Sequence, residues 1–256
     1  APHGQDLYFP RNVGLRCKLN VETPALMVQR ICGSGIQTMI SAFQQIALPD
    51  IVDESQIALC FGAESMSRTP QIKRSSRVSG ASFWDFTPEG ELEDTILASL
   101  DHTLAKTSMM VTADEYAAGV GITRKECDEF AVLSHKRARE ANSKSHFNGG
   151  DYLKGMFAVD ACDLIGRPIY MSSDECVRET TYDALSGLPG FTKNRLVSPG
   201  NASEISDGAG AVIVADRARA DVLGLSTRYE IAGYGICGVE PRIMGKGPVP
   251  SIQQAL

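Results

Sequence analysis

The spacing of hydrophobic residues changes twice in the first quarter of the chain. Residues 25–31 (ALMVQRI) form a mostly apolar run that suits a buried strand. Residues 36–48 (IQTMISAFQQIAL) carry apolar positions at helical spacing, and residues 56–61 (QIALCF) suit a second strand. A connection of this length predicts a β-α-β unit with parallel strands and a right-handed crossover.

The middle of the chain carries more charge and predicts loops with two helices, over residues 91–106 and 123–143. The second opens with Thr123 as its N-cap and has Glu126 three residues on, which is the capping-box arrangement. Two further strands are predicted over residues 209–215 (AGAVIVA) and 229–238 (YEIAGYGICG). Residues 251–256 (SIQQAL) are typical of the start of a helix. The order indicates an α/β domain interrupted by an insertion.

Composition excludes several functional classes. The chain has 256 residues, of which 43% are hydrophobic, so it can bury the core of one large domain or two ordinary ones. A formal charge of -6 with scattered Lys and Arg argues against nucleic acid as a partner. The apolar runs fall far short of the ~20 residues of a membrane helix, and no secretory signal pattern opens the chain. We therefore expect a soluble protein with no membrane span.

Seven cysteines lie far apart, with no C-x-x-C pair and no Cys/His cluster at zinc spacing. This usage predicts reduced thiols, an intracellular compartment and no metal site. One cysteine, Cys32, follows the first predicted strand and precedes Gly33, Ser34 and Gly35 at the start of the predicted helix. Cysteines also often serve as small buried core residues, and that alternative stands for Cys32.

The position of Cys32 favours a nucleophile. The N-H groups and the dipole at a helix N-terminus favour the thiolate over the thiol. Gly33 and Gly35 remove side chains beside the sulfur, which allows a sharp turn and a close approach of a substrate. The local N-H groups would also stabilise an oxyanion formed on an attacked carbonyl.

Five segments, in order, resemble the thiolase family over nearly the whole chain: ETPALMVQRICGSGIQ, FGAESMSRTP, MMVTADEYAAGVGITRKECDEFA, SPGNASEISDGAGAVIVAD and MGKGPVPSIQQAL. The likeness is closest to the acetyl-CoA acyltransferases (3-ketoacyl-CoA thiolases). The resemblance implies the thiolase fold, with five layers (α-β-α-β-α) made of two βαβαβαββ halves and a loop domain inserted in the first. It places an incomplete N-terminal half at residues 1–73 and 196–224, the loop domain at 74–195 and the start of the C-terminal half at 225–256.

The resemblance implies that Cys32 takes the acyl group from a 3-ketoacyl-CoA in fatty-acid β-oxidation, releases acetyl-CoA and passes the acyl group to coenzyme A; the reverse reaction is a Claisen condensation. The family also uses a His in a G-H-P segment, a Cys in a C-x-G-G-G segment and an Asn in an N-E-A-F segment. None of these segments occurs here, and the four histidines match none of them: His3, His102, His135 and His146. We expect a piece truncated at both ends that is inactive alone. His135 is expected in solvent.

Contacts with coenzyme A, the substrate, carry over from the family residue by residue, and no tightly bound cofactor is implied. Ser203 would contact the pantetheine and Pro199 would lie against it, while Arg178 would lie near the adenine and phosphates. Apolar positions that match residues near the ligand are Phe191, Leu100 and Met109. Ordinary packing is the alternative for these three, and a turn role is the alternative for Ser203.

Two departures from the family bear on specificity. Relatives of the biosynthetic type often have His-Met-Gly where this chain has Ser108-Met109-Met110, which favours the degradative type. Phe61 replaces a Gly, and it either trims the pocket or fills a gap in the core. The pair Asp207-Gly208 is expected to shape a turn.

The family assembles as a homodimer or homotetramer and is cytoplasmic in bacteria, and otherwise mitochondrial or peroxisomal. Two rival functions remain open. One is a non-catalytic CoA-binding or scaffold member that keeps Ser203 and Arg178. The other is a Cys-His hydrolase, which needs a partner His.

Overall fold

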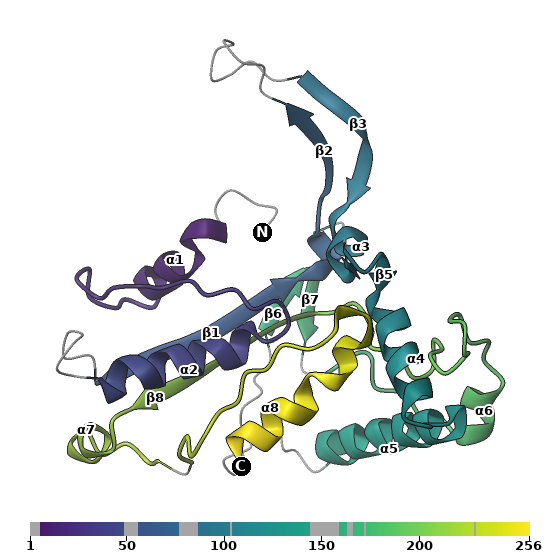
Figure 1. The fold of residues 1–256 in the computed structure, drawn as a ribbon. Helices are drawn as coiled ribbons and strands as arrows, with labels where there is room; N and C mark the ends of the chain where they lie inside the picture. Colours follow the sequence, from purple (N-terminus) through teal and green to yellow (C-terminus); the bar gives the residue numbers. More distant parts are fainter. Residues whose placement is uncertain are drawn as a thin grey trace. The chain divides into compact units, whose positions relative to one another are not determined.

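The structure is a computed structural model that describes residues 6–48, 56–76, 87–102, 104–143, 159–162, 166–171, 173–227 and 229–256. The chain divides into two compact units. Figure 1 labels the helices and strands of both. The first unit comprises Ala1–Asp101, Ile205–Cys237 and Pro248–Leu256, and the second comprises His102–Glu204 and Gly238–Gly247. This division does not test the boundaries predicted for the loop domain, residues 74–195, which remain a prediction.

The elements of the first unit are η1 (Asp6–Tyr8), α1 (Phe9–Arg16), α2 (Ser34–Ala47), β1 (Ile57–Ser65), η2 (Met66–Arg68), β2 (Gln71–Ser76), β3 (Thr87–Asp94), α3 (Thr95–Leu100), β8 (Asp207–Ala215), α7 (Arg217–Val222) and α8 (Pro248–Ala255). Those of the second are β5 (Thr107–Ser108), α4 (Met109–Gly119), α5 (Arg124–Ser143), β6 (Val159–Cys162), β7 (Pro168–Met171), α6 (Tyr182–Ser186) and η3 (Pro241–Lys246). Strand β4 (Asp101–His102) joins the two units along the chain.

The core of the first unit lies where α2 runs along the β1/β8 pair (Figure 1). The two strands are antiparallel, in register from Ile57 opposite Ala215 to Ser65 opposite Asp207. Cys60 of β1 is buried, and its thiol lies 3.5 Å from the carbonyl oxygen of Thr38 on α2. Burial raises the pKa of Cys60. The apolar period read from residues 36–48 and 209–215 is therefore confirmed by α2 and β8.

The predicted parallel pairing is wrong. Residues 25–31 form no strand in the described chain and carry only an isolated bridge between Arg30 and Cys32. Leu26 and Met27 of this run are exposed, at 61% and 44%. Strand β1 instead pairs with β8, about 150 residues later in the sequence, because an apolar run specifies a buried face but not the strand that will lie beside it.

The segment 229–238 was predicted as a strand, but its described residues form none. Tyr234 holds it against α2, since its ring lies 6.2 Å from that of Phe43 and its hydroxyl accepts a hydrogen bond of 2.9 Å from Gln44. At the next residue, a Cβ on Gly235 would collide with the carbonyl oxygen of Ser251 in α8. Glycine therefore lets the backbone of α8 approach closely.

The helix predicted over residues 91–106 starts later and is shorter. Strand β3 continues to Asp94, whose carboxylate then accepts the N-H groups of Ile96 (2.9 Å) and Leu97 (3.1 Å). A side chain that caps the first turn in this way sets the start of the helix at Thr95. The helix has six residues and ends at Leu100.

The helix predicted over residues 123–143 is confirmed as α5, with its capping box. The N-H and the hydroxyl of Thr123 donate to the Glu126 carboxylate at 2.8 and 2.7 Å, and the N-H of Glu126 donates to the Thr123 hydroxyl at 3.3 Å. These bonds hold the pKa of Glu126 below its usual value. The second unit also packs η3 on α4, where Arg242 donates to Glu115 at 2.7 Å.

No helix in the described ranges is long and apolar enough to cross a membrane. The same ranges hold no group of three or more His, Cys, Asp or Glu side chains that would bind a metal ion.

Candidate functional site

Cys32 lies in a tight turn that leads directly into α2. The turn closes through the N-H of Gly33, which donates to the carbonyl of Arg30 at 2.9 Å, and the N-H of Ser34, which donates to that of Ile31 at 3.1 Å. Cys32 is exposed, so its thiol is open to reagents, and the alternative of a buried core cysteine does not describe it. The sequence correctly placed this thiol at a helix N-terminus, although no strand precedes it in the described residues.

The strained residue of the turn is an isoleucine. Ile31 has φ 47°, in the left-handed region that β-branched residues seldom adopt. Gly33, which was expected to supply the backbone freedom, has an ordinary φ of -85°. Its small size matters instead, since a Cβ there would lie 3.3 Å from the carbonyl oxygen of Arg30. At Gly35 an added Cβ would meet nothing within 4 Å, which leaves open space beside the start of the helix.

The Ser34 side chain ties the turn together. Its hydroxyl oxygen accepts the N-H of Arg30 at 2.8 Å. The same oxygen lies 2.7 Å from the carbonyl of Ile31 and 2.8 Å from the side-chain oxygen of Gln29, and its single proton bonds one of them at a time. Ser34 thus links residues on both sides of the strained position and restricts the turn that carries Cys32.

Two backbone donors at the start of α2 remain available. The first helical hydrogen bond runs from the N-H of Gln37 to the carbonyl of Gly33 at 3.0 Å. No acceptor in the described chain takes the N-H groups of Gly35 or Ile36. Free N-H groups at a helix N-terminus attract negative charge, so this end of α2 suits a thiolate or an oxyanion.

The residues predicted to contact coenzyme A divide between the units. Leu100 ends α3 in the first unit and is 37% exposed. Met109 begins α4 in the second unit and is half-buried. Ser108, at the position where biosynthetic relatives carry His, caps that helix by accepting the N-H of Val111 at 3.4 Å. The serine therefore has a structural use of its own.

Three further candidates lie on the irregular segment between α6 and β8. Phe191, Pro199 and Ser203 are all exposed. The Ser203 hydroxyl makes no hydrogen bond with any described group, so a turn bond to its own backbone is not formed. All three are open to a ligand in the second unit.

Arg178 is engaged by a carboxylate next to Ser203. Its guanidinium forms an ion pair with Glu204, and the backbone N-H of Arg178 donates to Nδ1 of His135 at 3.2 Å. His135, expected in solvent, is half-buried and has this partner. A hydrogen bond from Cys176 to Glu204 lowers the pKa of Glu204 and raises that of the thiol. The structure thus brings the two predicted polar contacts, Arg178 and Ser203, to the same region of the second unit.

Asp114 is a residue that the sequence pattern did not reveal. It is buried and accepts hydrogen bonds from the Thr192 hydroxyl (2.6 Å) and from the N-H groups of Asn194 (2.9 Å) and Leu196 (3.0 Å). Burial by itself would raise its pKa, but these bonds outweigh burial and hold the pKa below its usual value. Asp114 therefore anchors the segment that carries Phe191.

Asp207 does not shape a turn, as was expected, but begins β8. Its carboxylate accepts the N-H of Ser67 at 2.9 Å and the hydroxyl of Ser67 at 2.6 Å, and these bonds lower its pKa. The partner lies 140 residues away, which no local pattern reveals. Phe61 packs on Phe9 with ring centroids 5.6 Å apart, and both residues are half-buried within the first unit. His3, His146 and the side chain of His102 lie outside the described residues.

Comparison with known proteins agrees with the sequence resemblance. Residues 1–218 match the family model described as the N-terminal domain of thiolase. The mitochondrial 3-ketoacyl-CoA thiolase of Mus musculus is 36% identical over 250 residues, which are 97% of this chain and 60% of the mouse protein. The chain therefore spans about 60% of the length of this relative.

Solved structures give the same answer. The crystal structure of human mitochondrial 3-ketoacyl-CoA thiolase matches with a TM-score of 0.85 at 35% identity and covers 100% of this chain and 61% of that one. Its complex with CoA matches with a TM-score of 0.84 at 34% identity, over 100% of this chain and 60% of that one. The chain thus has the thiolase fold over the part that it spans. With a family match over residues 1–218, the chain belongs to the thiolase family.

Proposed function

We propose that Cys32 of this chain holds the acyl group in an acyltransferase reaction that cleaves 3-ketoacyl-CoA with coenzyme A, and that the chain alone accepts this group without completing the cycle. The observation that carries the proposal is an exposed thiol in a restricted turn, followed at once by a helix with two N-H groups that bond no acceptor among the described residues. The names of the mouse relative and of the human structures support the substrate class, since both proteins are 3-ketoacyl-CoA thiolases, and one of those structures is a complex with CoA.

The proposed reaction has two thioester steps. The Cys32 thiolate attacks the C3 carbonyl carbon of the 3-ketoacyl-CoA, and the C2-C3 bond breaks. The electron pair stays on C2, which takes a proton to give acetyl-CoA, and the remaining acyl group is left on sulfur. The thiolate of a second coenzyme A then attacks this thioester, forms the shortened acyl-CoA and releases the Cys32 thiolate. The N-H groups of Gly35 and Ile36 stabilise negative charge beside the sulfur.

Coenzyme A is proposed as a substrate that binds through Ser203, Arg178, Phe191, Pro199, Leu100 and Met109, without a tightly bound cofactor. Arg178 suits phosphate oxygens because guanidinium binds them through paired hydrogen bonds. We further propose a homodimer or homotetramer. The proposed location is intracellular, in the cytoplasm of a bacterium or in a mitochondrion or peroxisome, which the word mitochondrial in the names of several relatives supports in part.

A single acylation tests this proposal more directly than turnover. The protein is exposed briefly to acetyl-CoA or acetoacetyl-CoA, its intact mass is measured, and any acetyl adduct is mapped by peptide analysis. We expect one acetyl group on Cys32, absent from Cys32→Ser. Cys17→Ser is the matched control, because Cys17 is a second exposed thiol of the same unit. A protein that binds CoA but gives no adduct would support a non-catalytic member of the family instead.

A further inference from the structure

The segment that carries Phe191, Pro199 and Ser203 has little regular structure of its own. Between α6, which ends at Ser186, and β8, which begins at Asp207, the described chain consists of turns and irregular backbone. Such a segment binds a ligand well only if contacts outside it restrict its conformation, because ordering a loop on binding costs affinity. Asp114 of α4 restricts the middle of this segment, and a second set of contacts joins the segment to α5.

The side chain of Arg124, in the first turn of α5, donates hydrogen bonds to backbone carbonyls of α6 and of the segment that follows it. One terminal nitrogen donates to the carbonyls of Leu185 and Leu188, both at 3.0 Å, and the other donates to that of Arg195 at 3.2 Å. Its Nε donates to the carboxylate of Asp128 at 2.8 Å, one helical turn further on. All three nitrogens of one guanidinium are therefore used to join α5 to the segment.

Asp128 passes the connection to the other end of the segment. Its side chain is completely buried, and Oδ1 accepts a hydrogen bond of 2.9 Å from Nδ2 of Asn201. A buried carboxylate needs both a cation and donors to offset its desolvation, and Arg124 and Asn201 supply them.

Asn201 shapes the loop around Pro199. Its Nδ2 also donates to the carbonyl of Leu196 at 2.9 Å, and its Oδ1 accepts the N-H of Ser198 at 2.9 Å. The backbone N-H of Asn201 returns to the carbonyl of Ser198 at 3.1 Å, so Pro199 sits inside a closed loop. Ser203 follows only two residues later, and its position depends on the same anchor.

We propose that Asp128 and Asn201 are positioning residues for coenzyme A, which hold Pro199 and Ser203 in the conformation that binds the pantetheine. This inference rests on the proposed function. In this proposal, Asp128 and Asn201 do not contact the ligand themselves. Arg124 neutralises the buried carboxylate of Asp128, and the bond between Asp128 and Asn201 sets the geometry of the loop.

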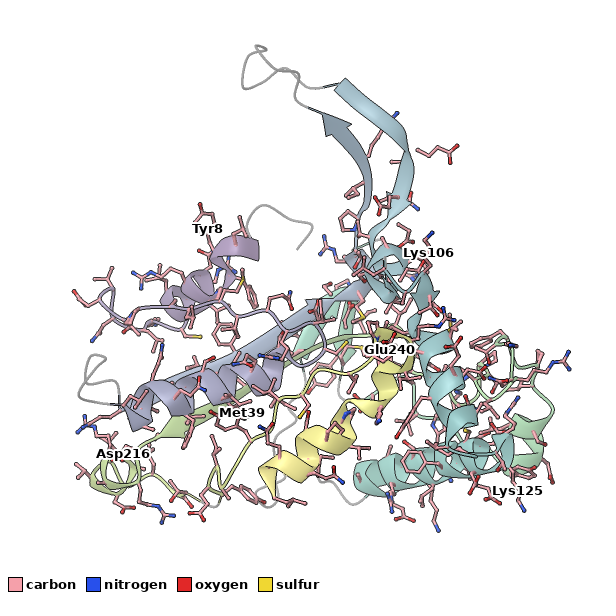
Figure 2. All side chains as sticks on the ribbon, viewed as in Figure 1. Tyr8, Met39, Lys106, Lys125, Asp216 and Glu240 are labelled. Atoms are coloured by element: carbon pink, nitrogen blue, oxygen red, sulfur yellow. The ribbon has the colours of Figure 1, made fainter. Side chains whose placement is uncertain are left out.

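The test compares Asn201→Ala with Glu129→Gln in the full chain. Glu129 is the matched control, because it lies next to Asp128 on α5 and pairs with Lys125 at 3.7 Å on the exposed side, where Figure 2 labels Lys125. The dissociation constants for coenzyme A and for pantetheine are measured by calorimetry. The rate at which iodoacetamide alkylates Cys32, and the unfolding midpoint, are measured on the same samples.

We expect Asn201→Ala to weaken coenzyme A and pantetheine by the same factor, about tenfold, since both ligands share the pantetheine. Alkylation of Cys32 should stay unchanged, and Glu129→Gln should bind like the wild type. A folded N201A protein with wild-type affinity for both ligands would overturn the inference, as would an equal loss in Glu129→Gln.

If Asn201→Ala does not fold, the double variant D128N/N201D takes its place, because an amide and a carboxylate still face each other with their roles exchanged. This variant should bind coenzyme A better than D128N alone, and equal affinities for the two would overturn the inference. The outcomes also separate the two proposals. A wild type that binds coenzyme A without acylation of Cys32 contradicts the proposed function alone, whereas a wild type that binds neither ligand overturns both.

Discussion

The hydroxyl oxygen of Ser34 accepts the backbone N-H of Arg30 at 2.8 Å, across the turn that contains Cys32. The first residue of α2 is thereby bonded to the residue before the strained position, and the backbone that carries the Cys32 thiol is restricted. A nucleophile held in this way needs little rearrangement before it attacks, which lowers the entropic part of the barrier.

Ser34→Ala should slow acylation of Cys32 by acetyl-CoA by about threefold to tenfold, the equivalent of roughly 0.7–1.4 kcal/mol for the loss of one hydrogen-bonding group. The rate is followed by quenched intact-mass measurements. Ser41→Ala is the control, because Ser41 lies on the same helix and accepts only a bond of 3.1 Å from Gln37. Equal rates for Ser34→Ala and the wild type would show that the turn keeps its shape without the hydroxyl.

Gly33→Ala and Gly35→Ala should separate effects on the stability of the fold from effects on the approach of acetyl-CoA to Cys32. At Gly33 the added methyl group meets the carbonyl of Arg30 at 3.3 Å, so we expect a loss of about 1 kcal/mol in the free energy of unfolding. At Gly35 it meets nothing, and a glycine replaced within a helix should raise that free energy by up to about 1 kcal/mol. Gly35→Ala should nevertheless slow acylation by acetyl-CoA, because the methyl group occupies the open approach to α2.

Urea unfolding measures the first effect, and iodoacetamide is the small reagent that controls for the second. Alkylation of Cys32 by iodoacetamide should be unchanged in Gly35→Ala. A G35A protein that reacts normally with acetyl-CoA as well would place the substrate on another side of the thiol.

Asp114 should make the second unit sensitive to acid. Its hydrogen bonds hold its folded-state pKa below the unfolded value of about 3.9, so its contribution to stability is present above about pH 4. That contribution is lost as the pH falls through the folded-state pKa, because the unfolded chain takes up the proton first. Unfolding free energies measured by urea from about pH 5 to about pH 3 should fall more steeply in the wild type than in Asp114→Asn.

At neutral pH the Asp114→Asn protein should itself be less stable by about 1–3 kcal/mol, because an amide cannot accept all three donors in the carboxylate geometry. Parallel pH curves for the two proteins would mean that Asp114 has the same pKa in the folded and the unfolded chain, which would contradict the expected acid sensitivity.

The ion pair between Arg178 and Glu204 predicts opposite effects of its two members on ligand binding. Glu204→Gln frees the guanidinium and should tighten coenzyme A by about threefold to tenfold, whereas Arg178→Gln should weaken it by a similar factor. Pantetheine, which lacks the nucleotide phosphates, should bind all three proteins alike. A change in pantetheine affinity would assign the pair to loop structure rather than to the phosphates.

Local chemistry in the sequence predicted the elements that depend on neighbouring residues. The capping box of Thr123 and Glu126, the helical period of α2 and the thiol before it all follow from residues within one or two turns. Helix α3 starts later than the apolar spacing predicts because Asp94 caps it, and an aspartate at that position is typical of a cap.

Contacts between distant residues set the rest. The spacing of Arg124 and Asp128 predicts an ion pair on α5, but nothing local says that Asn201 completes it 73 residues later. The same holds for Asp207 and Ser67. The dipeptide Asp207-Gly208 is typical of a turn but begins β8, because Asp207 bonds Ser67 in the segment that follows β1. A residue with few local options, such as a buried aspartate, takes its role from the tertiary structure.

Ile31 shows what such a turn means for the course of evolution. A branched side chain at φ 47° costs on the order of 1–3 kcal/mol, which glycine or asparagine at the same position would largely avoid. Random libraries at position 31 selected only for folding should therefore enrich glycine and asparagine. Libraries selected for acylation of Cys32 should keep isoleucine if a stiffer backbone at position 31 orients the neighbouring sulfur. The residue at position 31 would then indicate whether selection for stability or for reactivity of the thiol has dominated.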